Sequence, residues 1–154
     1  MNIRKPTDYT AMFATLDAAV AAQLPQMELY REIGRVVSGR AEKGAAVAAS
    51  EYLQATYPAA EGFSPRNVRR MRDFYRVYGD TPELLAAAMR LNWTQNVAIM
   101  EAGLTMDERC WYIRKAAESG LSKTELLRMI TSSAHLEIAL GENEDTCYTV
   151  ENDE

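Results

Sequence analysis

GFSPRNVRRMRDFYRVYG, residues 62–79, decides the fold class because it combines a helix start, an apolar stripe and a run of arginines. Ser64 can cap a helix by accepting a backbone N–H, and Pro65 suits the first helical position, where its missing N–H costs nothing. Apolar residues then recur every three or four positions, which predicts one buried helix face. The residues of that face are Val68, Met71, Phe74, Tyr75 and Tyr78.

The opposite face of this predicted helix is cationic. Residues 66–76 hold five arginines and one acid, Asp73. A guanidinium group can donate two parallel hydrogen bonds to phosphate oxygens, so the face is suited to grip a nucleic-acid backbone. The candidate phosphate-binding residues are Arg66, Arg69, Arg70, Arg72 and Arg76. The alternative interpretation is a solvated surface whose arginines pair with acids elsewhere, since runs of charge commonly serve solubility.

Every other periodic segment of the chain also has helical spacing, and the sequence predicts an all-α, compact multi-helix domain. Further helices are expected at residues 8–23, from residue 29 onward, and at residues 46–56, 82–90 and 91–102. Gly79 is expected in the left-handed conformation after the arginine-rich helix. Two capping boxes, Thr105 with Glu108 and Ser122 with Glu125, predict the last two helix starts.

These last two helices have the residue spacing of a helix-turn-helix unit. A small residue, a turn glycine and two apolar residues occur in the appropriate order: Ala116, Gly120, Leu126 and Met129. In a DNA-binding unit of this kind the second helix would direct five side chains toward a groove: Ser122, Lys123, Thr124, Arg128 and Thr131. A plain corner between two packed helices needs the same glycine, so that interpretation stays open, as does the presence of a β wing.

Four segments resemble the N-terminal domain of the YhcG-type nucleases, bacterial proteins whose C-terminal half is a PD-(D/E)XK nuclease. The segments are LYREIGRVVSGR (residues 29–40), YLQATYPAAEGFSPRNVRRMRDFY (52–75), LNWTQN (91–96) and WYIRKAAESGLSKTELLRMI (111–130). The third segment departs from the family pattern, in which one or two histidines follow the tryptophan. Here Trp93 is followed by Thr94, Gln95 and Asn96. The resemblance implies a DNA-binding role.

The elements of the catalytic half of that family are absent from the sequence. A nuclease of this class needs carboxylates that hold Mg²⁺ and a nearby Lys that assists the attacking water. No Glu, Gln or Asp in the chain has Lys two positions later. We therefore expect a freestanding relative of the N-terminal module that is not an enzyme.

Composition limits the remaining possibilities. The formal charge of −5 is uneven, because residues 137–154 hold seven of the 22 acids and none of the 17 bases. We expect one helical domain over residues 1–136 and a disordered acidic tail over residues 137–154. There is no apolar run of membrane-spanning length and no secretory signal, which predicts a cytoplasmic protein without a membrane partner. Two cysteines and one histidine do not provide the usual spacing of a zinc site, so neither a metal nor another cofactor is expected.

Two functions remain as hypotheses. The first is a non-catalytic DNA-binding module whose partner is duplex DNA. The second is an interaction module that forms homo-oligomers or partners a nuclease or another defence or mobile-element protein.

Overall fold

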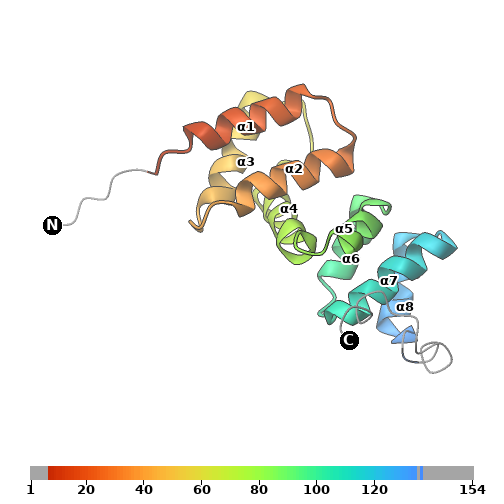
Figure 1. Ribbon diagram of the computed structural model, residues 1–154. Helices are drawn as coiled ribbons and strands as arrows, with labels where there is room; N and C mark the ends of the chain where they lie inside the picture. Colours follow the sequence, from red (N-terminus) through yellow and green to blue (C-terminus); the bar gives the residue numbers. More distant parts are fainter. Residues whose placement is uncertain (1–6, 135, 137–154) are drawn as a thin grey trace. The chain divides into compact units, whose positions relative to one another are not determined.

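The computed structural model describes residues 7–134 and 136 and is all-α within them, as predicted (Figure 1). Of the described residues, 71% are helical and none lies in a strand, which leaves no β wing in this part of the chain. The helices are α1 (Thr10–Ala21), α2 (Gln26–Ser38), α3 (Ala45–Thr56), α4 (Pro65–Tyr78), α5 (Pro82–Met89), α6 (Trp93–Met100), α7 (Met106–Ser119) and α8 (Lys123–Thr131).

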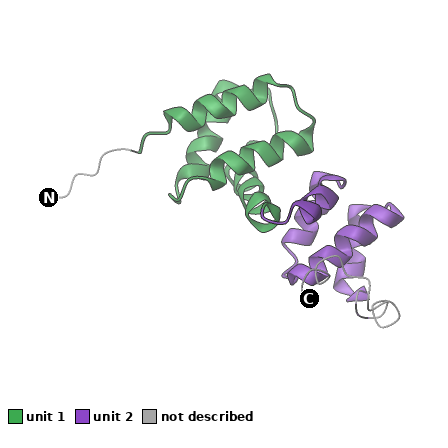
Figure 2. Ribbon diagram, in the orientation of Figure 1, with its two compact units in different colours: residues 1–79 green, residues 80–154 purple. Residues whose placement is uncertain are grey.

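The chain divides into two compact units, coloured separately in Figure 2. Unit 1 is Met1–Gly79 and holds α1 to α4, and unit 2 is Asp80–Glu154 and holds α5 to α8. The expectation of one domain over residues 1–136 stays a prediction. The expected acidic tail, residues 137–154, lies outside the described residues.

Unit 1 is built around the close packing of α2 against α4, with α1 and α3 completing its core. Gly34 of α2 permits this approach, because a Cβ at that position would lie 2.1 Å from the carbonyl oxygen of Met71 on α4. No real side chain tolerates that distance, so the glycine sets the spacing between the two helices. Ile33, Leu53 and Phe74 are fully buried in the resulting core.

Polar contacts between distant residues tie the other helices of unit 1 together. The buried Ser50 hydroxyl on α3 donates to the carbonyl of Phe63, 2.6 Å away, and so fixes the segment that leads into α4. Tyr52 and Tyr57 both donate to the carboxylate of Asp17 on α1, each over 2.6 Å. The Tyr52 ring also stacks on Phe13, with ring centroids 4.2 Å apart.

Unit 2 relies on local signals at the helix ends. Capping boxes start α6, α7 and α8, and the boxes at Thr105 and Ser122 confirm the sequence predictions. Gly120 ends α7 in the left-handed conformation, with φ 62° and ψ 39°.

In unit 1, the prediction of a left-handed conformation for Gly79 is wrong, because Gly79 has φ −63°. A Cβ there would lie 2.5 Å from the carbonyl oxygen of Tyr75, so crowding accounts for that glycine.

Candidate nucleic-acid interface

Helix α4 begins and buries its residues as the sequence predicts. The backbone N–H of Asn67 donates to the Ser64 hydroxyl over 3.2 Å, and Pro65 occupies the first helical position. Val68, Met71, Phe74 and Tyr78 are fully buried, and Tyr75 is half-buried. With the apolar stripe turned into unit 1, the other side of α4 is directed outward.

The predicted arginines share that outward side of α4. At about 100° per residue, they span roughly 160° of the helix circumference. Arg66, Arg69 and Arg76 are exposed, and Arg70 and Arg72 are half-buried. We call these five residues the cationic face of α4. The structure therefore brings together five of the seven residues predicted to bind nucleic acid.

Most of the charge of the cationic face of α4 is not neutralised by its own helix. Asp73 is the single acid of α4, and it pairs with its neighbour Arg72 over 3.0 Å. Arg66 and Arg69 form no ion pair within residues 7–134 and 136. Five guanidinium groups and one carboxylate leave a formal charge of +4 on a surface about three turns long, from Arg66 to Arg76.

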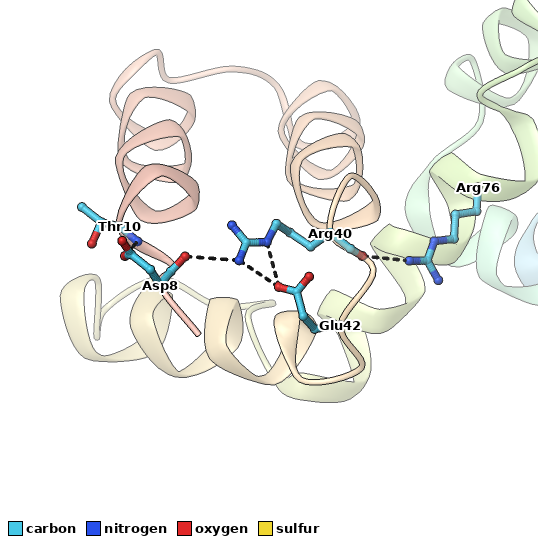
Figure 3. A network of polar contacts seen from close by, with 5 residues as sticks. All are labelled: Asp8, Thr10, Arg40, Glu42 and Arg76. Atoms are coloured by element: carbon cyan, nitrogen blue, oxygen red, sulfur yellow. Dashed lines mark hydrogen bonds and ion pairs between the residues drawn. The ribbon is translucent and has the colours of Figure 1, made fainter. Parts of the chain in front are cut away.

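Arg40 lies next to this face (Figure 3). The sequence patterns did not identify it as a candidate residue. Its backbone carbonyl accepts a hydrogen bond from Arg76 over 3.4 Å. Its guanidinium group pairs with Glu42 over 2.8 Å, donates to the carbonyl of Asp8 and lies 4.8 Å from the centroid of the Tyr9 ring. The hydrogen bond from Arg40 holds the pKa of Glu42 below its usual value. Arg40 thus uses its charge inside unit 1. Glu42 is only two residues away, but the contacts of Arg40 with Asp8 and Arg76, more than 30 residues away, follow no local sequence pattern.

The other two predicted residues, Lys123 and Arg128, lie on α8 in unit 2, and both are exposed. Of the four residues predicted to form the corner that presents them, Gly120 is left-handed, Ala116 and Leu126 are buried, and Met129 is half-buried. A helix-turn-helix role for this corner stays a prediction. The seven predicted residues therefore form two sets, five on α4 of unit 1 and two on α8 of unit 2.

Comparison with known families supports the resemblance seen in the sequence. The family model of the DUF1016 N-terminal domain, the N-terminal domain of the DUF1016 or YhcG family, matches residues 12–137. The chain belongs to this family. The matched model describes an N-terminal domain and not a nuclease catalytic domain. Neither a curated protein nor a solved structure matches the chain.

In this member of the DUF1016 family, the polar residues that follow Trp93 hold unit 2 together. Asn92 and Gln95 form the capping box of α6, and the Gln95 side chain also donates to the carbonyl of Leu121 in the turn between α7 and α8. Asn96 is fully buried and donates to the carbonyls of Ala88 and Asn92 over 2.9 and 3.0 Å. Gln95 thus fixes the turn between α7 and α8, and Asn96 ties α6 to the end of α5.

Other surfaces of this DUF1016 chain offer less to a ligand. A groove of about 360 Å³ lies between α1 and α2, and its two arginines, Arg35 and Arg40, pair with Glu32 and Glu42. Within residues 7–134 and 136, no three His, Cys, Asp or Glu side chains gather as metal ligands would. None of the helices in that part of the chain is both long and apolar enough to cross a membrane.

Proposed function

We propose that the chain is a non-catalytic DNA-binding module in which the cationic face of α4 contacts the phosphates of duplex DNA. The observation that carries the proposal is the outward array of five arginines on one rigid helix, with a single carboxylate among them. Arg suits this role because its planar fork matches phosphate oxygens. Lys123 and Arg128 on α8 provide further cationic contacts.

The distribution of charge permits such binding despite the net charge of −5. The chain outside residues 137–154 carries 17 bases and 15 acids, a formal charge of +2. Attraction to phosphate acts within a Debye length of about 8–10 Å, so a local array matters more than the total. Positive charge is concentrated on α4, which holds five of the 17 bases in 14 residues.

The salt dependence of binding tests this proposal. The affinity for a labelled duplex is measured by fluorescence anisotropy between low and physiological salt. If about four phosphates are neutralised, log K falls with log salt at a slope of roughly −3.6, and Arg66→Ala with Arg69→Ala reduces the slope to about −1.8. Both arginines are exposed, so the double variant should keep the wild-type helix content by circular dichroism.

The matched control is Arg35→Ala with Lys43→Ala, which removes two exposed cations of the same unit that do not lie on α4. It should leave the slope within error of wild type. Undetectable binding at low salt would contradict the proposal. Equal slopes for the two double variants would contradict the assignment to α4.

A second candidate function is association with a protein partner, either a copy of this chain or a nuclease. It is favoured by Leu136, the more exposed of the two exposed large apolar residues described, at 60%. Sedimentation velocity of wild type and Leu136→Ser tests it. Concentration-dependent assembly that Leu136→Ser weakens supports this function, whereas a monomer at all concentrations excludes self-association through that residue.

A further inference from the structure

Helix α8 presents a mixed surface that the phosphate contacts do not explain. Five exposed side chains lie within roughly 140° of its circumference at about 100° per residue. They are two cations, two threonines and a leucine: Lys123, Arg128, Thr124, Thr131 and Leu127. Leu127 is 40% exposed and lies between Thr124 and Thr131 along the helix axis. We call these five residues the outer face of α8.

Contacts from two other helices hold α8 in place behind this surface. Leu126 is fully buried, and the Tyr112 hydroxyl on α7 donates to the carbonyl of Met129 over 3.3 Å. From α6, Gln95 donates to the carbonyl of Leu121 just before α8 begins. The outer face is thus carried by a helix anchored at its start and at its buried side, as a rigid reading element requires.

The acid on α8 is engaged at the start of the helix. The Glu125 carboxylate accepts the backbone N–H of Ser122 over 2.9 Å, and this bond, with the Ser122 hydroxyl, lowers the pKa of Glu125. The ionised carboxylate therefore faces the amide groups of its own first turn. Lys123 and Arg128 lie on either side of Leu127 on the outer face. The two cations suit a polyanion, and Leu127 suits a methyl group on the same ligand.

We infer that the outer face of α8 enters the major groove of duplex DNA and reads thymine, with Leu127 against the C5-methyl group. This inference rests on the proposed function and adds sequence preference to it. The major groove is about 12 Å wide and admits an α-helix of 10–12 Å diameter. Thymine alone presents a methyl group there, and threonine and other apolar side chains contact it, while Arg128 can donate to guanine or to phosphate.

The test removes the methyl group from the DNA and the leucine from the protein. Duplexes bound by wild-type protein are selected from a random pool, and each thymine of the best binder is replaced in turn by deoxyuridine, which differs only by that methyl group. Wild type should bind at least one substituted duplex about fourfold more weakly, the effect of burying one methyl group. Leu127→Ala should bind the thymine and deoxyuridine duplexes equally, with an unchanged salt slope.

Glu83→Ala, an exposed change on α5 of the same unit, is the control and should keep the fourfold discrimination. The inference is overturned if no sequence is enriched, if deoxyuridine has no effect, or if Leu127→Ala still discriminates. It is also overturned if Leu127→Ala alters sedimentation instead of discrimination, because Leu127 then belongs to a protein contact. Salt-dependent binding without discrimination removes this inference alone, whereas no binding at low salt removes the proposed function too.

Discussion

The two units of this chain hold their helices in different ways. In unit 1, the key contacts join residues far apart in sequence, as Gly34 does with Met71 and Ser50 with Phe63, and α1, α2 and α3 start without a side-chain cap. In unit 2, three of the four helices start with a capping box whose partners are three residues apart. A single change in packing should therefore lower the stability of unit 1 strongly. In unit 2, changes at individual helix ends should each lower the stability by a smaller amount.

Gly34→Ala should have the largest effect, because the new Cβ would lie 2.1 Å from the Met71 carbonyl oxygen and force α2 away from α4. Overpacking of this kind lowers the free energy of unfolding by about 3 kcal/mol. Urea unfolding followed by circular dichroism measures the loss. Both tryptophans, Trp93 and Trp111, lie in unit 2, so their fluorescence reports that unit separately.

Gly39→Ala, at the end of the same helix, is the control for Gly34→Ala. Its Cβ would lie 3.5 Å from the nearest described atom outside its neighbours, and its φ is −72°. An alanine that fits such a position changes stability by about 1 kcal/mol or less. If both variants unfold at the same urea concentration, the close contact between α2 and α4 does not limit the stability of unit 1.

Asn96→Ala should have the next largest effect and should act on unit 2. It removes the buried amide that donates to the carbonyls of Ala88 and Asn92. Each carbonyl keeps a backbone N–H donor, so the loss is that of the two side-chain hydrogen bonds, about 1 kcal/mol each and about 2 kcal/mol together. The tryptophan fluorescence transition should move to lower urea, while Arg90→Ala, an exposed change in the same unit, should leave it in place. A variant that shifts only the circular dichroism signal would refute this assignment.

Ser122→Ala should have a smaller and more local effect. It removes the hydroxyl that accepts the backbone N–H of Glu125 over 3.1 Å, and loss of such a cap costs about 1 kcal/mol. Hydrogen exchange should accelerate at the amides of α8 and remain unchanged in unit 1. Ser122→Asp keeps an acceptor at the cap and should restore slow exchange. Equal exchange in wild type and Ser122→Ala would show that packing through Leu126 is sufficient to hold α8.

The same contrast explains what the sequence could reveal. The two faces of α4 were predictable because helical periodicity alone separates Val68 and Met71 from Arg66 and Arg69. The start of α8 was predictable because Ser122 and Glu125 are only three residues apart. All seven candidate site residues lie on the helices expected for them, and DNA contact by them stays a prediction.

The tertiary roles in unit 1 could not be predicted in the same way. Gly34 meets Met71 across 37 positions of sequence, and Arg40 meets Arg76 across 36. Helical spacing says nothing about which faces of two helices meet, or how closely. The prediction of a left-handed conformation for Gly79 was wrong for a related reason. A glycine at the end of a helix can serve close packing as well as a left-handed turn.

The smallest effect should come from the Asp17 cluster and should appear as a pH dependence of unit 1. The hydrogen bond to Asp17 raises the pKa of Tyr57 to about 12, and the bonds from Tyr52 and then Tyr57 lower the pKa of Asp17. Because the pKa of Tyr57 is higher in the folded state than its unfolded value of about 10, its contribution is complete below pH 10 and is lost as pH rises toward 12.

The contribution of Asp17 to stability changes with pH in the opposite direction. Its folded pKa is depressed, so its contribution is present above its ordinary value of 3.8 and is lost as pH falls through the folded pKa. Urea unfolding by circular dichroism should therefore show a decline of stability above pH 10 that Tyr57→Phe reduces. Asp17→Asn should reduce the same alkaline decline at least as much, because it also removes the bond from Tyr52, and adding Tyr57→Phe to Asp17→Asn should change nothing further. Additive effects of the two changes would mean that Tyr57 titrates independently of Asp17, and the alkaline loss would then belong to other tyrosines of the chain.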